Sequence, residues 1–296
     1  WAAAGARNGK AISIFQGLKE YLDDSNIMFA QGCDIESNDY SRFDKAVNIA
    51  KKADKIIMVL GEDYNMSGEA ASRTNIKLPG IQTQLIKTIR DELPNKPIIL
   101  VLMNGRPLDL TIEDSLADAI LEVWYPGTSG GLGVADILFG KYNPSAKLPI
   151  TFPRNLGQVP IYYNQKNTGR PISKENPTED YKSNYIDSPN TPLYPFGHGL
   201  SYTTFKYSEI KLSSDKVKES EILKASSTIT NTGDFDGHEV VQLYIRDKVG
   251  SITRPIKELK GFKKIFLKKG ESKTVVFDIS SEDLKFYNNG KLILES

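Results

Sequence analysis

The fold of this chain is decided by two apolar runs, IIMVL at residues 56–60 and PIILVLM at residues 97–103. A segment with helical spacing precedes each run, at residues 43–52 and 79–93. Runs that are apolar on both faces are typical of strands that helices cover on both sides of a sheet. The alternation of helix and strand therefore predicts a doubly wound α/β sheet.

The same alternation continues on both sides of these runs. We expect helices at residues 10–22 and 134–139, and strands at residues 26–30, 119–125 and 147–152. The α/β domain would then occupy residues 1–152. The chain opens on WAAAG, residues 1–5, with no strand before its first helix, although an α/β domain normally opens on a strand. We therefore expect the chain to be a fragment of a longer protein.

The character of the sequence changes after residue 152. Residues 153–204 are rich in proline and tyrosine and keep no sustained period, which predicts an irregular linker. Beyond it the period becomes two, and turn sequences at residues 231–233 and 269–271 separate the strands. The residues expected on the inner faces of two strands are Val241, Leu243, Ile245, Val275, Phe277 and Ile279. Residues 205–296 are therefore predicted to form a small all-β sandwich.

Composition narrows the classes of partner. The chain has 38 Lys and Arg against 37 Asp and Glu, a net charge of +1, and no long run of one sign, which argues against a nucleic-acid or membrane surface. No apolar stretch approaches the roughly 20 residues of a membrane span. The N-terminus shows no signal peptide pattern, and composition leaves the compartment undecided.

The sequence predicts neither a metal nor a cofactor. Cys33 is the only cysteine, so an intrachain disulfide and a thiolate-based zinc site are excluded. The two histidines, His198 and His238, do not have the spacing of metal ligands. The glycine-rich GGLG at residues 130–133 lacks the lysine of a P-loop, which argues against nucleotide binding.

A long acidic loop, GEDYNMSGEAASR at residues 61–73, follows the first apolar run. In open α/β sheets ligands gather outside the carboxyl ends of the strands, so this loop is the first candidate site. Its acids are Glu62, Asp63 and Glu69, and a carboxyl group there could serve as a general acid and base. The plainer interpretation is that all three are solvated surface acids.

Two other candidates belong to different functional classes. Residues 127–131, GTSGG, fit the spacing of a nucleophile elbow with Ser129 as nucleophile, and Asp187 and His198 follow in the order of a serine hydrolase. A glycine-rich turn is the plainer interpretation, because Pro126 and Gly127 end the strand early and the helical pattern begins only later.

A non-catalytic module that binds a glycan or a protein is the third class. Its candidate aromatics, which lie in strand patterns typical of core, are Tyr244, Phe262 and Tyr287.

Several motifs together resemble one known family. In chain order they are GEAASR at 68–73, LPGIQ at 78–82, VLMNGRP at 101–107, WYPG at 124–127, FGKYNPSAKLP at 139–149, YPFGHGLSY at 194–202 and RPIKELKGF at 254–262. The chain resembles the C-terminal portion of glycoside hydrolase family three, of the β-glucosidase type. That resemblance implies an α/β sandwich domain followed by an immunoglobulin-like or fibronectin type III-like sandwich.

The resemblance also implies a mechanism and a place for it. Retaining enzymes of this type use two carboxyl groups about 5–5.5 Å apart, a nucleophile and a general acid/base. The family's nucleophile is an aspartate on an N-terminal (β/α)8 barrel, which this chain lacks. By motif match the acid/base is Glu69, with Glu62 as runner-up. The expected substrate is a β-glucoside or an oligosaccharide with terminal β-linked glucose. The resemblance further implies a periplasmic or secreted protein, and the chain by itself is expected to be inactive.

Overall fold

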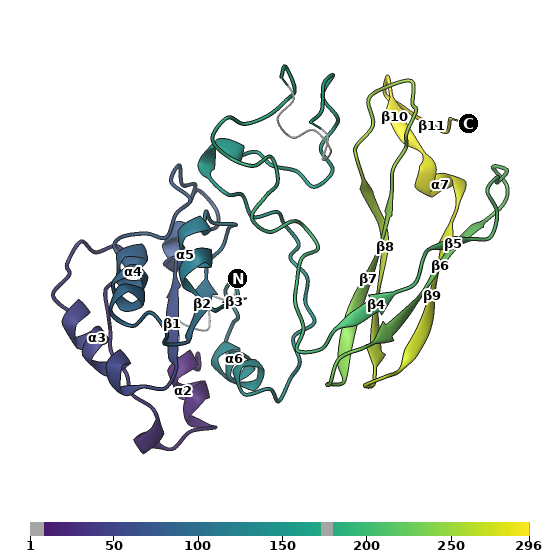
Figure 1. Ribbon diagram of the computed structural model, residues 1–296. Coiled ribbons are helices and arrows are strands. Elements are labelled where there is room, and N and C mark those ends of the chain that lie inside the picture. Colours follow the sequence, from purple (N-terminus) through teal and green to yellow (C-terminus); the bar gives the residue numbers. More distant parts are fainter. Residues whose placement is uncertain (1–8, 173–179, 296) are drawn as a thin grey trace. The chain divides into compact units, whose positions relative to one another are not determined.

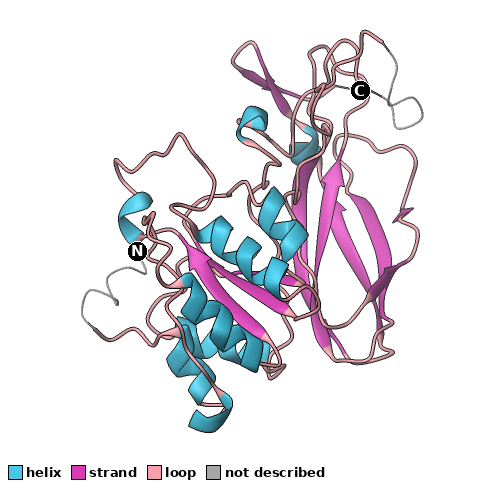
Figure 2. Cartoon of the chain, turned by 60° about the vertical axis from the view of Figure 1, so that its left-hand side comes forward, coloured by secondary structure: helices cyan, strands magenta, loops and turns pink. Residues whose placement is uncertain are grey.

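The computed structural model describes residues 9–172 and 180–295. Residues 1–5, where the sequence suggested a missing first strand, lie outside the described residues. The chain divides into two compact units, of which the first comprises Trp1–Tyr142, Phe152–Val159 and Pro192–Tyr194. The second comprises Asn143–Thr151, Pro160–Thr191 and Pro195–Ser296. Strands flanked by helices build the first unit, whereas strands and loops dominate the second (Figure 2).

The two apolar runs are adjacent parallel strands, as predicted. The sheet of the first unit has the order β1-β2-β3, with β1 at Ile56–Gly61, β2 at Ile98–Met103 and β3 at Ala119–Glu122. The helices are α2 (Ile14–Lys19), α3 (Phe43–Lys52), α4 (Gln82–Glu92), α5 (Thr111–Leu116) and α6 (Gly130–Leu138). Short 3-10 turns lie at Asp24–Asn26, Tyr64–Met66 and Leu156–Gln158. The helix predicted at residues 43–52 has the predicted bounds.

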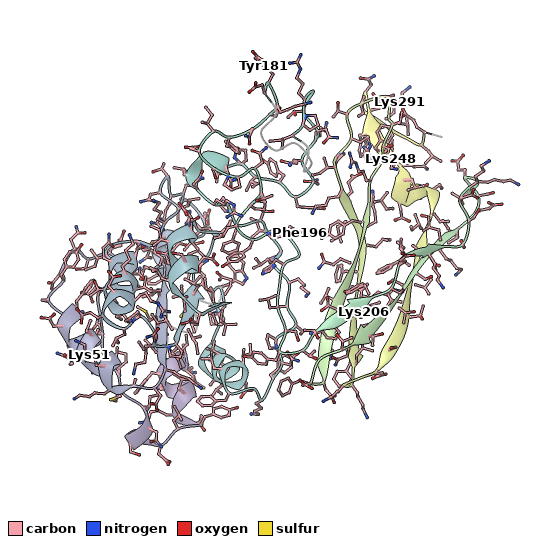
Figure 3. All side chains as sticks on the ribbon, in the orientation of Figure 1. Lys51, Tyr181, Phe196, Lys206, Lys248 and Lys291 are labelled. Carbon is pink, nitrogen blue, oxygen red and sulfur yellow. The ribbon has the colours of Figure 1, made fainter. Side chains whose placement is uncertain are left out.

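Helices cover both faces of this sheet, which confirms the doubly wound class. Figure 1 shows α3 and α4 on one side of the strands and α6 on the other. On the α6 side, Ile14 and Leu18 of α2 pack with Val134 of α6 against Val101 of β2. The helices α3 and α4 are further joined by an ion pair of 3.0 Å between Lys51, labelled on α3 in Figure 3, and Glu92.

Two predicted strands are wrong. Residues 27–30 pair with no strand among the described residues, and the side chains of Met28 and Phe29 are exposed by 45% and 63%. Residues 147–152 form no strand: Phe152 makes an isolated antiparallel bridge with Tyr194, and Leu148 makes backbone hydrogen bonds with Gly197 and His198. Apolar composition favours a strand, but a strand also needs a continuous ladder of hydrogen bonds to a neighbour. Residues 27–30 have no such neighbour in the described structure, and residues 147–152 pair only at isolated positions.

The second unit contains a two-layer β-sandwich, as predicted. Its strands are β4 (Phe205–Tyr207), β5 (Lys211–Leu212), β6 (Leu223–Asn231), β7 (Gly237–Ile245), β8 (Glu258–Leu267), β9 (Ser272–Ile279), β10 (Phe286–Asn288) and β11 (Lys291–Ile293), with the short helix α7 at Ser281–Leu284. The strand β6 pairs with β4, β5 and β9, and β7 pairs with β8. Ile229, Val241, Ile265, Leu267 and Val275 are buried between these two sheets.

Candidate active site

The acidic loop begins at the carboxyl end of β1, and its first acid is entirely buried. The side chain of Glu62 has no exposed surface. Its Oε1 accepts from Arg73 at 2.5 Å and pairs with Nε of Arg106 at 2.9 Å. The Gly105 N–H also donates to Glu62 Oε2 at 3.2 Å. A buried carboxylate needs such charged partners. Glu62 therefore joins the start of the loop to its end at Arg73 and to the segment that follows β2.

Further contacts fix the middle of the loop to its neighbours. The guanidinium of Arg106 donates to the carbonyl oxygens of Met66 and Ala71. Ser67 Oγ donates to the Gly105 carbonyl at 3.3 Å. A Cβ atom on Gly105 would lie 2.1 Å from Ser67 Oγ, so only glycine allows this approach. The loop therefore has a defined course on both sides of residues 68–70.

Glu69 lies on the exposed turn between these anchors. Gly68 and Ala70 both have positive φ, 113° and 58°, and the Ala71 N–H closes the turn on the Gly68 carbonyl at 3.3 Å. The side chain of Glu69 is exposed, and no hydrogen bond or ion pair to it is found within the described ranges. The structure thus separates the acids of the loop: Glu62 is occupied in ion pairs, whereas Glu69 projects from the turn.

Asp63 stabilises the start of the loop. Its Oδ1 accepts from the backbone and side chain of Asn65, both at 2.9 Å, and caps the 3-10 turn Tyr64–Met66. The Asp63 carbonyl accepts from the Tyr125 hydroxyl at 3.0 Å. Burial, with Glu62 nearby, raises the pKa of Tyr125, which keeps this donor protonated.

A second acidic group, which the sequence did not single out, lies at the same edge of the sheet. Glu122 ends β3, and Asn104 directly follows β2. Burial raises the pKa of Glu122 to about 7, although the hydrogen bond from the Trp124 backbone N–H and the nearby Asn104 side chain oppose the shift. The available signal was an acid inside the apolar run at residues 119–125. An acid at the carboxyl end of a parallel strand belongs among the candidate site residues.

Ser129 does not have the geometry of an elbow nucleophile. The strand β3 ends at Glu122, well before Ser129, whereas an elbow serine directly follows its strand. The predicted late start of the helix is wrong, because α6 already begins at Gly130 with Ser129 at its N-cap position. Ser129 belongs to the first unit, and Asp187 and His198 belong to the second. No group of three or more residues suited to a metal occurs in the part of the chain that the structure describes.

The aromatic side chains proposed for a binding module differ in exposure. Tyr244 is half-buried, and its ring lies edge-on to that of Tyr163 at 6.2 Å. Phe262 and Tyr287 are exposed by 66% and 71%, so the expectation that they belong to the core is wrong for both. Phe262 lies on the outer side of β8, while Ile265 and Leu267 of the same strand point into the sandwich.

Known proteins are similar to this chain over nearly its whole length. The model of the glycosyl hydrolase family 3 C-terminal domain matches residues 1–202, and that of the fibronectin type III-like domain matches residues 239–296. A periplasmic beta-glucosidase of Salmonella typhimurium is 47% identical over 97% of this chain and 40% of its own length. A beta-xylosidase of Formosa agariphila is 40% identical over 94% of this chain and 37% of its own.

Solved structures agree with these matches. A beta-glucosidase from Listeria innocua, crystallised with gluconolactone, superimposes with a TM-score of 0.92 at 38% identity, over 97% of this chain and 39% of that one. The chain therefore spans about two fifths of the length of these relatives. Since the domain model, the curated relatives and the solved fold agree, the chain belongs to glycoside hydrolase family 3 and carries its C-terminal domain followed by a fibronectin type III-like domain.

Proposed function

We propose that this chain is the C-terminal part of a retaining β-glucosidase-like enzyme and that Glu69 is its general acid and base. The observation that carries the proposal is the contrast between two glutamates of one loop. Glu62 is buried against two arginines, whereas Glu69 is exposed on a turn that anchors hold on either side. A general acid must come within hydrogen-bond reach of the leaving oxygen, which requires an accessible carboxyl group.

In the proposed reaction Glu69 acts twice. It first protonates the leaving oxygen while a nucleophilic carboxylate attacks the anomeric carbon and forms a glycosyl-enzyme. It then removes a proton from the water that hydrolyses this intermediate. The nucleophile would be an aspartate on an N-terminal barrel outside this chain, so we expect the chain alone to be inactive.

The proposed substrate is a β-glucoside or an oligosaccharide with a terminal β-linked glucose. Relatives named beta-glucosidase and beta-xylosidase support a β-linked pyranoside, and the Salmonella and Listeria relatives favour glucose. The name of the Salmonella relative also supports a periplasmic or secreted location. Within the described residues no helix has the length and apolar character that crossing a membrane requires.

The test uses the longer protein that includes the upstream reading frame, with two aryl β-glucosides. One carries a poor leaving group that needs a proton, and the other carries a good leaving group that departs without one. For Glu69→Gln we expect kcat/KM to fall roughly 10²–10⁴-fold on the first substrate and to change little on the second, because only the first needs general acid catalysis. An equal effect on both substrates would contradict the assigned role.

Two controls accompany this measurement. The chain of residues 1–296, assayed alone, is expected to release no aryl group above background. Release that depended on Glu69 would show that the chain contains its own nucleophile. An aryl β-xyloside assayed in parallel decides between the two sugars, and a higher kcat/KM on the xyloside would replace glucose in the proposal.

A further inference from the structure

Two buried oxygen atoms beside the Glu69 loop have no hydrogen-bond partner in the described structure: Oδ1 of Asn104 and Oε2 of Glu122. The residues lie on adjacent strands, because Leu102 of β2 is opposite Glu122 of β3 and Asn104 follows β2. Asn104 is fully buried. Buried polar atoms are nearly always paired, so two unpaired acceptors at the carboxyl ends of adjacent strands require an explanation.

The orientation of both side chains is fixed by their other contacts. Asn104 Nδ2 donates to the Arg106 carbonyl at 2.8 Å. Turning the amide over would place Oδ1 against that carbonyl oxygen, so the unpaired atom is Oδ1. Glu122 Oε1 accepts the Trp124 N–H at 2.9 Å, which leaves Oε2. The Asn104 side chain lies within interaction range of the Glu122 carboxyl group. Two acceptors in this position are satisfied if a single proton lies between them.

We propose that Glu122 is protonated, that its Oε2–H donates to Asn104 Oδ1, and that this hydrogen bond makes Glu122 a positioning residue for the Glu69 loop. The catalytic meaning of that positioning rests on the proposed role of Glu69. The protonation and the ordering of the loop do not depend on it.

A short chain of contacts connects Glu122 to the loop. Trp124 has φ 51°, a left-handed conformation that is costly for a bulky residue and persists only when its surroundings enforce it. The Glu122 carboxyl group accepts the N–H of this strained residue. The turn places the Tyr125 ring beside Gly105, where an added Cβ would lie 2.9 Å from Cε2, and directs the Tyr125 hydroxyl to the Asp63 carbonyl. Glu122 thus acts on the loop through Trp124 and Tyr125.

Ionisation of Glu122 would loosen this arrangement. A carboxylate would face Asn104 Oδ1 as a second acceptor and would be buried near the negative charge of Glu62. Arg73 and Arg106 already pair with Glu62, and the phenol of Tyr125 is neutral. Because burial sets the pKa of Glu122 at about 7, the loop is expected to be ordered in mild acid and to loosen as the pH rises through that value.

Hydrogen exchange of the loop tests the proposal on the chain as it exists. In wild type, protection of the hydrogen-bonded amides of residues 63–71, corrected for intrinsic rates, should be greatest near pH 4.5, fall by up to about tenfold for each pH unit towards about 7, and level off above that value. Glu122→Gln keeps both hydrogen bonds, since its amide donates to Asn104 and its carbonyl accepts from Trp124, so its protection should not vary with pH. Glu113→Gln is the matched control: Glu113 is also buried with a raised pKa, but it contacts Thr83, and this variant should behave like wild type.

Wild-type protection that is independent of pH, or that falls equally in Glu122→Gln, overturns the proposal. If Glu122→Gln does not fold, NMR of wild type and Glu113→Gln with ¹³C-labelled glutamate carboxyl groups decides. A carboxyl carbon that titrates near pH 7 in both proteins supports the proposal, and its absence from both overturns it. Neither readout uses a substrate, so failure of Glu69 as acid/base would leave both results unchanged.

Discussion

At the scale of single residues, one loop carries two glutamates with different physical roles. Glu62 forms ion pairs with both Arg73 and Arg106, whose side chains are each only 18% exposed. We expect Glu62→Gln to lower the free energy of unfolding by about 3 kcal/mol, because it leaves two largely buried guanidinium groups without their counter-charge. Urea unfolding measures the change. Glu69→Gln is the matched control and should leave the urea midpoint unchanged, since its side chain is exposed.

The opposite ranking would reverse this assignment. If Glu69→Gln destabilised the chain while Glu62→Gln did not, Glu69 would hold the loop and Glu62 would be the free carboxylate. Glu62, the runner-up, would then replace Glu69 as the proposed general acid and base. The stability measurement therefore tests the separation of roles without any substrate.

At the scale of elements, α2 and α6 approach so closely that glycine is required at their contact. A Cβ on Gly131 of α6 would lie 2.1 Å from the carbonyl oxygen of Ser13, the N-cap residue of α2. We expect Gly131→Ala to destabilise the first unit by about 1–3 kcal/mol, because the two helices must move apart. Thermal unfolding followed by circular dichroism measures it.

The same helix supplies the control. Gly133 has no atom within 4 Å of an added Cβ, so Gly133→Ala should stabilise α6 by roughly 0.5–1 kcal/mol through lower backbone entropy in the unfolded chain. Equal effects of the two alanines would mean that helix propensity, and not the close contact, decides stability at both positions.

At the scale of the whole molecule, buried carboxyl groups make stability depend on pH. Burial raises the pKa of Glu113 and Glu122, so their contribution is complete below about 4.5 and is lost as the pH rises through their folded values. The Ile98 N–H lowers the pKa of Asp118, and the Ser280 N–H lowers that of Asp283. The contribution of these two is present above about 3.8 and is lost in stronger acid.

These opposite trends predict a stability maximum in mild acid. We expect the free energy of unfolding to be higher near pH 5 than near pH 8, measured by urea titration at both values. Burial lowers the pKa of the half-buried His198 and works against this trend. The double variant Glu113→Gln/Glu122→Gln should lose most of the difference. Higher stability of wild type at pH 8 would contradict the prediction.

The sequence predicted correctly those helices and strands that a local pattern of apolar residues defines. The apolar runs at residues 56–60 and 97–103 became β1 and β2, and the period-two pattern placed Val241 and Val275 inside the sandwich. Predictions failed where pairing was needed, at residues 26–30 and 147–152, because a strand exists only beside another strand. The exposure of Phe262 was missed because the alternation of a strand does not reveal which of its faces a second sheet covers.

By itself the sequence determined the fold class, the family and the loop that holds the candidate acids, because each follows from local patterns and motifs. Only the tertiary structure decided that Glu62 is the buried, paired acid and that Glu69 is exposed. Arg73 reaches Glu62 because the loop folds back on itself. Arg106 reaches it because parallel strands bring their carboxyl ends to one edge of the sheet. Ion pairs between residues far apart in sequence depend on that adjacency, which no local pattern encodes.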